Sequence, residues 1–190
     1  MPHTKITVIG AGSASFGLNT LGSLMKSKKL RGSHIALVDR NPEALGLMHR
    51  LAQRLNRDWD AQMTLTAHTH HTEALPGTSF VVAAIEVPPR EQLWRMDYEI
   101  PLKHGVRQPY AENGGPGGFA HAARNIGPVL EIAHDMEALC PDAYYINFTN
   151  PMVRICDALN RYSKIKVIGL CHQIYEGYAM AGYILADKLG

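Results

Sequence analysis

The sequence predicts an α/β fold built on a doubly wound parallel sheet. Short apolar runs alternate with longer segments of helical periodicity along the chain, and this alternation is typical of a parallel sheet covered by helices. A glycine-rich turn follows the first apolar run, and the run Phe80 to Ile85 is almost uniformly apolar. A strand that is apolar along its whole length is expected to be covered by helices on both faces of the sheet.

Six short segments are expected to form the strands, and they are residues 5–9, 35–38, 63–67, 80–85, 144–148 and 166–170. Most of these segments are dominated by apolar residues, whereas 63–67 alternates between apolar and polar positions. Six strands with helices between them predict the order 3-2-1-4-5-6 in one sheet.

Helices are expected between and after the strands, at residues 15–26, 42–60, 93–104, 119–139, 153–162 and 175–189. Asn41 is expected to cap the second helix because it precedes a proline at the first helical position. Pro101 is expected to interrupt the third helix and Gly127-Pro128 to kink the fourth. The glycine-rich segment 113–118 is expected to be a mobile loop.

The composition excludes several classes of protein. At 190 residues, with 46% hydrophobic and 19% charged, the chain is long enough for one well-cored domain and carries no disorder signature. A net charge of +2 argues against a nucleic-acid partner, and no apolar run approaches the roughly 20 residues that span a bilayer. Three widely spaced cysteines predict no disulfide framework, so the protein is expected to be cytoplasmic.

The turn after the first strand carries a nucleotide-binding signature. Gly10 and Gly12 let the backbone turn tightly and approach a pyrophosphate, which the next helix N-terminus stabilises. The usual third glycine is replaced by Ser15, and Gly17 follows two residues later. The position of this motif between a predicted strand and a predicted helix indicates a Rossmann-type, dinucleotide-binding domain. The alternative is an α/β domain whose glycines serve only packing.

An acidic residue closes the second predicted strand. The carboxylate of Asp39 is placed to accept hydrogen bonds from both ribose hydroxyls and to repel a 2′-phosphate. This favours NAD over NADP, although the adjacent Arg40 weakens the preference. The alternative is that Asp39 is a turn residue.

The fifth predicted strand ends in Asn147-Phe148-Thr149-Asn150-Pro151. The residue before a proline is held extended, so the amide of Asn150 is expected to point into the crevice beyond the strand ends. An amide suits a hydroxyl or a carboxamide because it both donates and accepts hydrogen bonds. An Asx turn that enters the next helix is the alternative.

Two charged residues precede that strand. Glu112 stands directly before the glycine-rich segment, whose movement would bring the carboxylate over a ligand. Arg95 lies further upstream and is suited to hold a polar substrate. The alternatives are a solvated acid on a flexible loop for Glu112 and a helix-surface charge for Arg95.

Cys171 and His172 follow the sixth predicted strand and suggest a metal. A buried structural cysteine is an equally good interpretation of Cys171, because sequence neighbours on an extended strand point in different directions. Structural roles fit the other two cysteines, Cys140 and Cys156. The cluster His68, His70 and His71 is better explained by an exposed polar edge than by a metal site.

These motifs together resemble the NAD- and metal-dependent family 4 glycoside hydrolases. The resemblance runs from Ile6 to about Tyr178. It rests on five ordered segments, which are residues 8–13, 99–105, 114–119, 147–152 and 169–172.

The resemblance implies a glycosidase that uses oxidation as a temporary device, outside the usual two-carboxylate scheme. The sugar is oxidised at C3 by NAD⁺, and the ketone acidifies the C2 proton. Removal of this proton lets the C1 substituent leave, water adds, and the ketone is reduced again. A divalent metal, typically Mn²⁺, holds the C2 and C3 oxygens.

The resemblance also assigns roles to residues. Cys171 would be a metal ligand, Asn150 would bind sugar hydroxyls and Arg95 would contact the substrate. Glu112 would lie near the base, and His172 stands where some members carry an aspartate that acts as the proton donor. This histidine points away from the branch that cleaves phosphorylated sugars. Cofactor contacts are expected from Gly10, Gly12, Ser13, Ser15, Phe16, Asp39 and Asn147.

Residues 1–172 are expected to form the NAD-binding domain and 173–190 to begin a C-terminal catalytic domain. The second metal ligand, a histidine, and the tyrosine base are expected beyond Gly190. The expected partner is a small carbohydrate, with no nucleic acid or membrane, and the expected assembly is a homo-oligomer. The alternatives are a lactate- or malate-type dehydrogenase and a non-catalytic NAD-binding module.

Overall fold

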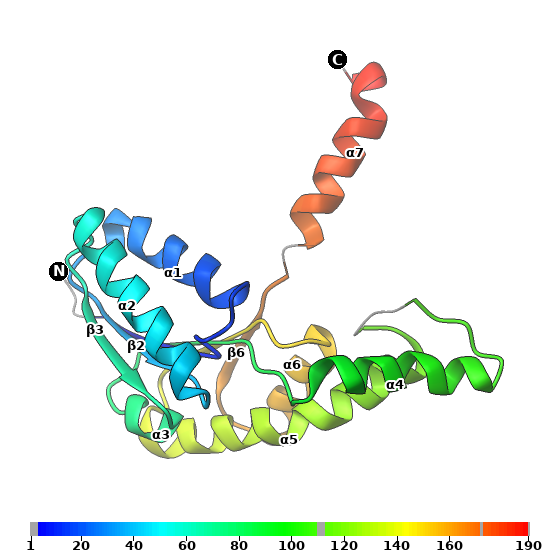
Figure 1. The fold of residues 1–190 in the computed structure, drawn as a ribbon, viewed down its shortest axis with the longest axis horizontal. Helices are drawn as coiled ribbons and strands as arrows, with labels where there is room; N and C mark the ends of the chain where they lie inside the picture. Colours follow the sequence, from blue (N-terminus) through cyan, green and yellow to red (C-terminus); the bar gives the residue numbers. More distant parts are fainter. Residues whose placement is uncertain (1–3, 110–112, 172, 190) are drawn as a thin grey trace.

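The computed structural model describes residues 4–109, 113–171 and 173–189, and these residues form one parallel sheet flanked by helices (Figure 1). The strand order is β3-β2-β1-β4-β5-β6, so the predicted order and the predicted fold class are confirmed. The strands are β1 (Lys5–Ile9), β2 (His34–Val38), β3 (Thr64–His68), β4 (Phe80–Ala83), β5 (Tyr144–Asn147) and β6 (Lys166–Gly169).

Two helices pack on one face of the sheet. They are α1 (Phe16–Lys26) and α2 (Pro42–Asp58), which bury Leu21 and Met48 against the strand residues Val8 and Leu37. The side chain of Asn41 accepts hydrogen bonds from the first-turn N–H groups of α2, so the predicted cap is confirmed. A short 3-10 helix, η1 (Lys28–Leu30), follows α1 and was not predicted.

The other face is covered by α3 (His71–Ala74), α5 (Gly115–Leu139) and α6 (Met152–Tyr162). Met136 of α5 and Leu159 of α6 are fully buried there, in one cluster with Val81 and Tyr145 of the sheet. The single turn α3 was not predicted, because four residues are too few to show a helical pattern in the sequence.

The helix α4 (Arg90–Lys103) begins earlier than predicted and continues through Pro101, so the predicted interruption is wrong. A proline in a helix leaves the carbonyl four residues earlier without its usual N–H partner. That carbonyl belongs to Asp97, and it accepts a hydrogen bond from Nε2 of Gln108 at 2.9 Å. The position of Pro101 in the last turn therefore costs little backbone hydrogen bonding.

The helix α5 begins inside the glycine-rich segment, so the prediction of a mobile loop at 113–118 is wrong from Gly115 onward. Pro116 lies in the first turn, where no intrahelical N–H bond is needed. A Cβ atom on Gly117 would overlap the side chain of Gln108 and the carbonyl of Asp97. This glycine therefore serves the close packing of α5 on α4.

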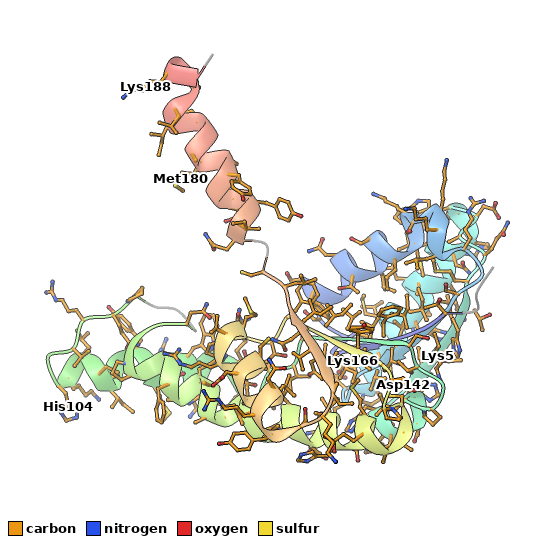
Figure 2. The ribbon with its side chains drawn as sticks, turned by 180° about the vertical axis from the view of Figure 1, so that it is seen from behind. Lys5, His104, Asp142, Lys166, Met180 and Lys188 are labelled. Carbon is orange, nitrogen blue, oxygen red and sulfur yellow. The ribbon has the colours of Figure 1, made fainter. Side chains whose placement is uncertain are left out.

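The last helix, α7 (Gln173–Leu189), projects away from the sheet and its flanking helices (Figure 1). Met180 and Lys188 lie far from Lys5, Asp142 and Lys166, which gather at the amino-terminal edge of the sheet (Figure 2). Large apolar side chains of α7 are exposed, including Tyr175, Tyr178, Met180, Tyr183 and Ile184. No helix among the described residues is long and apolar enough to cross a membrane.

Candidate functional site

The carboxyl edge of the sheet is where the predicted site residues meet. Backbone hydrogen bonds continue past the strand ends, from Ala84 N–H to Ile9 O at 3.1 Å and from Phe148 N–H to Ala83 O at 2.8 Å. The N–H of Leu170 likewise donates to Asn147 O at 3.0 Å. The segments that follow β1, β4, β5 and β6 therefore leave the sheet side by side, where ligands bind in such sheets.

The turn after β1 is held tightly against its neighbours. Gly10 has a φ of +85°, and its N–H and that of Ala11 donate to Val38 O at 2.9 and 3.0 Å. A Cβ atom on Gly10 would overlap the carbonyl oxygen of Ala84. Only glycine satisfies both the left-handed backbone and the close approach of the segment after β4.

Gly12 is bonded directly to the acidic residue at the end of β2. Its N–H donates to Oδ2 of Asp39 at 2.8 Å, and Oδ1 accepts the N–H of Asn41 at 2.9 Å. A Cβ atom on Gly12 would lie 2.7 Å from Oδ2 of Asp39 and 3.0 Å from Cβ of Ala44. The structure thus brings the two predicted cofactor contacts, Gly12 and Asp39, together.

The start of α1 carries three more of the predicted cofactor contacts, Ser13, Ser15 and Phe16. Oγ of Ser13 accepts the N–H of Phe16 at 3.1 Å, and the ring of Phe16 packs on Phe148 with centroids 5.4 Å apart. Ser15 is the exposed N-cap residue and makes no side-chain cap bond. A Cβ atom on Gly17 would overlap the carbonyl of Ala11, so the close-packing role of a third glycine falls on Gly17.

This loop fits a dinucleotide. The first turn of α1 carries no acidic residue, so the positive end of its helix dipole favours a pyrophosphate. Because residues 10 and 12 are glycines, no side chain blocks a pyrophosphate from the backbone of this loop. The carboxylate of Asp39 lies at the end of β2. A carboxylate there suits ribose hydroxyls, which donate hydrogen bonds.

The segment after β5 is an ordered polar turn. Asn147 is fully buried, with Nδ2 donating to Thr149 O at 2.9 Å and Oδ1 accepting Thr149 N–H at 3.2 Å. Oγ1 of Thr149 accepts the N–H of Ile85 at 3.0 Å and ties this turn to the segment after β4. The amide of Asn147 thus shapes the turn that carries Asn150, and Asn150 is half-buried just after this turn.

Arg95 lies on α4 and lines a pocket of about 580 Å³ together with Arg90, Glu91, Gln92 and Trp94. Its side chain is 76% exposed and pairs with Glu99 at 4.0 Å. The position is compatible with both a substrate contact and a surface charge.

Glu86, which the sequence reasoning missed, follows β4 at the same edge. Its Oε1 accepts the N–H of Val87 at 3.1 Å, and its Oε2 pairs with Nε of Arg90 at 3.4 Å. Nε2 of the buried His121 lies 3.6 Å from the same oxygen. Its position in the sequence could have revealed it, because Glu86 directly follows the predicted strand 80–85, just as Asp39 follows the predicted strand 35–38.

Cys171 is exposed just after β6. Within residues 4–109, 113–171 and 173–189, no group of three or more His, Cys, Asp or Glu side chains is placed to hold a metal ion. His68 instead contacts Glu73 at 3.3 Å and Thr66 at 3.1 Å, and His71 contacts Asp135 at 2.7 Å. Glu112 and His172 lie outside the described residues.

The fold and the glycine loop define a Rossmann-type α/β protein. Comparison with known families then identifies the family, because the profile of the family 4 glycosyl hydrolases matches residues 5–181. The chain belongs to this family. Membership sets aside the alternative of a lactate- or malate-type dehydrogenase.

Relatives with assigned activities support the same family. The chain is 44% identical over 172 residues to an alpha-glucosidase of Erwinia rhapontici, covering 90% of this chain and 38% of the relative. It is 37% identical over 170 residues to an alpha-galactosidase of Bacillus subtilis, covering 90% and 39%. The chain thus spans about two fifths of the length of these relatives.

A solved structure has the same fold. The 6-phospho-beta glucosidase of Thermotoga maritima, with manganese, NAD⁺ and glucose-6-phosphate, superimposes with a TM-score of 0.82 at 25% identity. The match covers 97% of this chain and 43% of that chain.

Proposed function

We propose that this protein is an NAD- and manganese-dependent glycosidase that acts on a small carbohydrate substrate. The observation that carries the proposal is the coincidence of family membership with the bond between Gly12 and Asp39 at the carboxyl edge. Two of the relatives are an alpha-glucosidase and an alpha-galactosidase, so an unphosphorylated hexoside is the proposed substrate.

NAD⁺, when bound, supplies reversible removal of hydride from a sugar carbon. Asp39 would accept hydrogen bonds from the ribose hydroxyls, and the glycine loop would let the pyrophosphate reach the N-terminus of α1. NAD⁺ is proposed over NADP⁺ because the carboxylate of Asp39 repels a 2′-phosphate.

On the sugar side, Asn150 would bind the hydroxyls and Arg95 would contact the ring substituents. Once C3 is a ketone, the C2 proton becomes acidic, and its removal lets the C1 oxygen substituent leave. His172 would donate a proton to that leaving oxygen. The negative charge of Glu112 would increase the basicity of the catalytic base. The roles of these four residues are supported by the resemblance of their motifs to the family.

Cys171 is proposed as one ligand of the divalent metal. A thiolate is a strong ligand for a transition metal, and Cys171 is exposed at the end of β6. The described residues offer no complete ligand set, so no step of the reaction is assigned to the metal.

The chain is proposed to contain an NAD-binding domain at residues 1–172 and the start of a substrate domain at 173–190. The separation of α7 from the sheet supports this boundary (Figure 2). A homo-oligomer in the cytoplasm belongs to the same proposal and is supported by the family resemblance.

The proposal is tested with p-nitrophenyl α-D-glucoside and α-D-galactoside, using the protein together with any sequence that follows Gly190 in its gene. We expect p-nitrophenol release that requires both NAD⁺ and Mn²⁺ and produces no net NADH. NADH that accumulates in step with product would instead show a net-oxidising dehydrogenase. Release that survives omission of NAD⁺ would also contradict the proposal.

A further inference from the structure

We propose that Glu86 selects an uncharged sugar by accepting hydrogen bonds from its hydroxyls, and that Arg90 and His121 position its carboxylate. This inference rests on the proposed glycosidase function and names the substrate class that the site takes.

The backbone fixes where Glu86 lies. The carbonyl of Ala84 abuts Gly10 in the loop after β1, and the N–H of Ile85 donates to Thr149 at 3.0 Å. The segment after β4 is therefore held between the glycine loop and the turn that carries Asn150. Glu86 is the next residue, so its side chain begins between the proposed cofactor loop and the proposed sugar-binding turn.

Contacts from two helices fix the carboxylate of Glu86. Nε of Arg90, on α4, lies 3.4 Å from Oε2, and Nε2 of His121, on α5, lies 3.6 Å from the same atom. The N–H of Val87 donates to Oε1 at 3.1 Å. The side chain of Glu86 is still 29% exposed, whereas that of His121 is 2% exposed. The carboxylate is thus held from the protein side and retains accessible acceptor capacity.

The positioning residues are themselves held. The guanidinium of Arg90 lies 4.3 Å from the ring centroid of Trp94, and the ring of Trp94 meets His121 edge-on with centroids 6.0 Å apart. Arg90 and Trp94 also line the pocket of about 580 Å³ on α4. A fixed carboxylate is suited to a sugar, because sugar hydroxyls donate hydrogen bonds that a carboxylate accepts.

The charges around Glu86 favour a neutral ligand over an anionic one. Arg90 is paired with Glu86, Arg95 with Glu99 at 4.0 Å, and Arg124 with Asp97. Each of these cations already has a carboxylate partner. A phosphate that approached Glu86 would meet a like charge in a partly desolvated site, and this repulsion is stronger there than in water.

The test compares kcat/KM for p-nitrophenyl α-D-glucoside and for its 6-phosphate, with NAD⁺ and Mn²⁺ present. The wild-type protein is expected to prefer the neutral glycoside, and Glu86→Gln to lower the ratio of the two kcat/KM values by about tenfold or more. Glu86→Asp keeps the charge and is expected to keep the preference. Asp58→Asn, an exposed carboxylate on α2, is the matched control and should leave the ratio unchanged.

The ratio separates selection from a structural role, because loss of folded protein lowers both rates equally. An unchanged ratio in a folded Glu86→Gln variant overturns the inference, as does a wild-type preference for the 6-phosphate. If the wild-type protein cleaves neither glycoside, the proposed function fails. Calorimetric titration with glucose and with glucose 6-phosphate then tests whether Glu86 still selects an uncharged sugar. Glucose binding that Glu86→Gln weakens then supports the inference, and equal binding by both proteins overturns it.

Discussion

The carboxylate of Asp39 accepts a hydrogen bond from the backbone N–H of Gly12, with 2.8 Å between Oδ2 and the nitrogen. This bond joins the loop after β1 to the end of β2, across 27 positions of sequence. The two elements proposed to bind the pyrophosphate and the ribose are therefore fixed relative to each other before a ligand arrives.

Gly12→Ala is expected to weaken NAD⁺ binding by about tenfold or more, because the new methyl group would lie 2.7 Å from Oδ2 of Asp39. Binding is measured by calorimetric titration. Gly22→Ala, within α1 and with nothing within 4 Å of the new atom, is the control. It should bind NAD⁺ normally and unfold at a slightly higher temperature, since alanine is favoured in a helix by about 1 kcal/mol. Equal NAD⁺ affinity in both variants would contradict the assignment of the loop.

Asp39→Asn is expected to reduce the preference for NAD⁺ over NADP⁺. The substitution removes the charge that repels a 2′-phosphate and one strong acceptor for the ribose hydroxyls. We expect the dissociation constant for NAD⁺ to rise about tenfold and that for NADP⁺ to fall. A wild-type protein that binds both cofactors equally would refute the role of Asp39.

Cys171→Ser is expected to abolish Mn²⁺-dependent glycoside cleavage and to leave NAD⁺ binding largely intact. A hydroxyl is a poor replacement for a thiolate ligand. Cys140→Ala removes a buried thiol from the core and serves as the control for loss of a cysteine. Full metal-dependent activity in Cys171→Ser would show that the ligand assignment is wrong.

Cys171 is expected to react with iodoacetamide before Cys140 and Cys156 do. Burial raises the pKa of the Cys140 and Cys156 thiols, whereas Cys171 is exposed. A raised pKa in the folded state stabilises the fold below the unfolded-state value, and this contribution is lost as pH rises through the folded pKa. Peptide mass spectrometry after limited alkylation checks the order, and raising the pH should increase labelling of Cys140 and Cys156.

Asn147→Ala is expected to lower the free energy of unfolding by about 1–3 kcal/mol. The variant leaves the N–H and carbonyl of Thr149 without the two bonds that the buried amide provides. Urea denaturation of this variant is compared with that of Asn160→Ala, an exposed position on α6 where little change is expected. A similar loss in both variants would contradict the role of Asn147 in shaping the turn.

The sheet order was predictable because each buried strand is a short apolar run and each connection is long enough for a helix. The placement of Gly10, Gly12 and Asp39 at one edge of the sheet was predictable for a related reason, since their spacing follows from the strand–turn–helix geometry. Their contact with NAD⁺ stays a prediction. In contrast, the continuation of α4 through Pro101 depends on Gln108, which supplies a hydrogen bond from a side chain outside the helix. Sequence periodicity carries no information about such a bond.

The remaining site features depend on contacts between distant segments. Glu86 is positioned by His121, which lies 35 residues further along on another helix, and the two residues share no local pattern. The buried amide of Asn147 forms hydrogen bonds with the backbone of Thr149. These bonds depend on the geometry of the turn, which the residue type alone does not reveal. Cofactor contact by Asn147 stays a prediction.

The most direct test of transient oxidation is glycoside cleavage in D₂O, followed by mass spectrometry and proton NMR of the released sugar. Removal and return of the C2 proton predict one deuterium at C2 of the product, in a reaction that requires NAD⁺. A product with no deuterium at C2 would show that cleavage proceeds by direct displacement, and it would contradict the account.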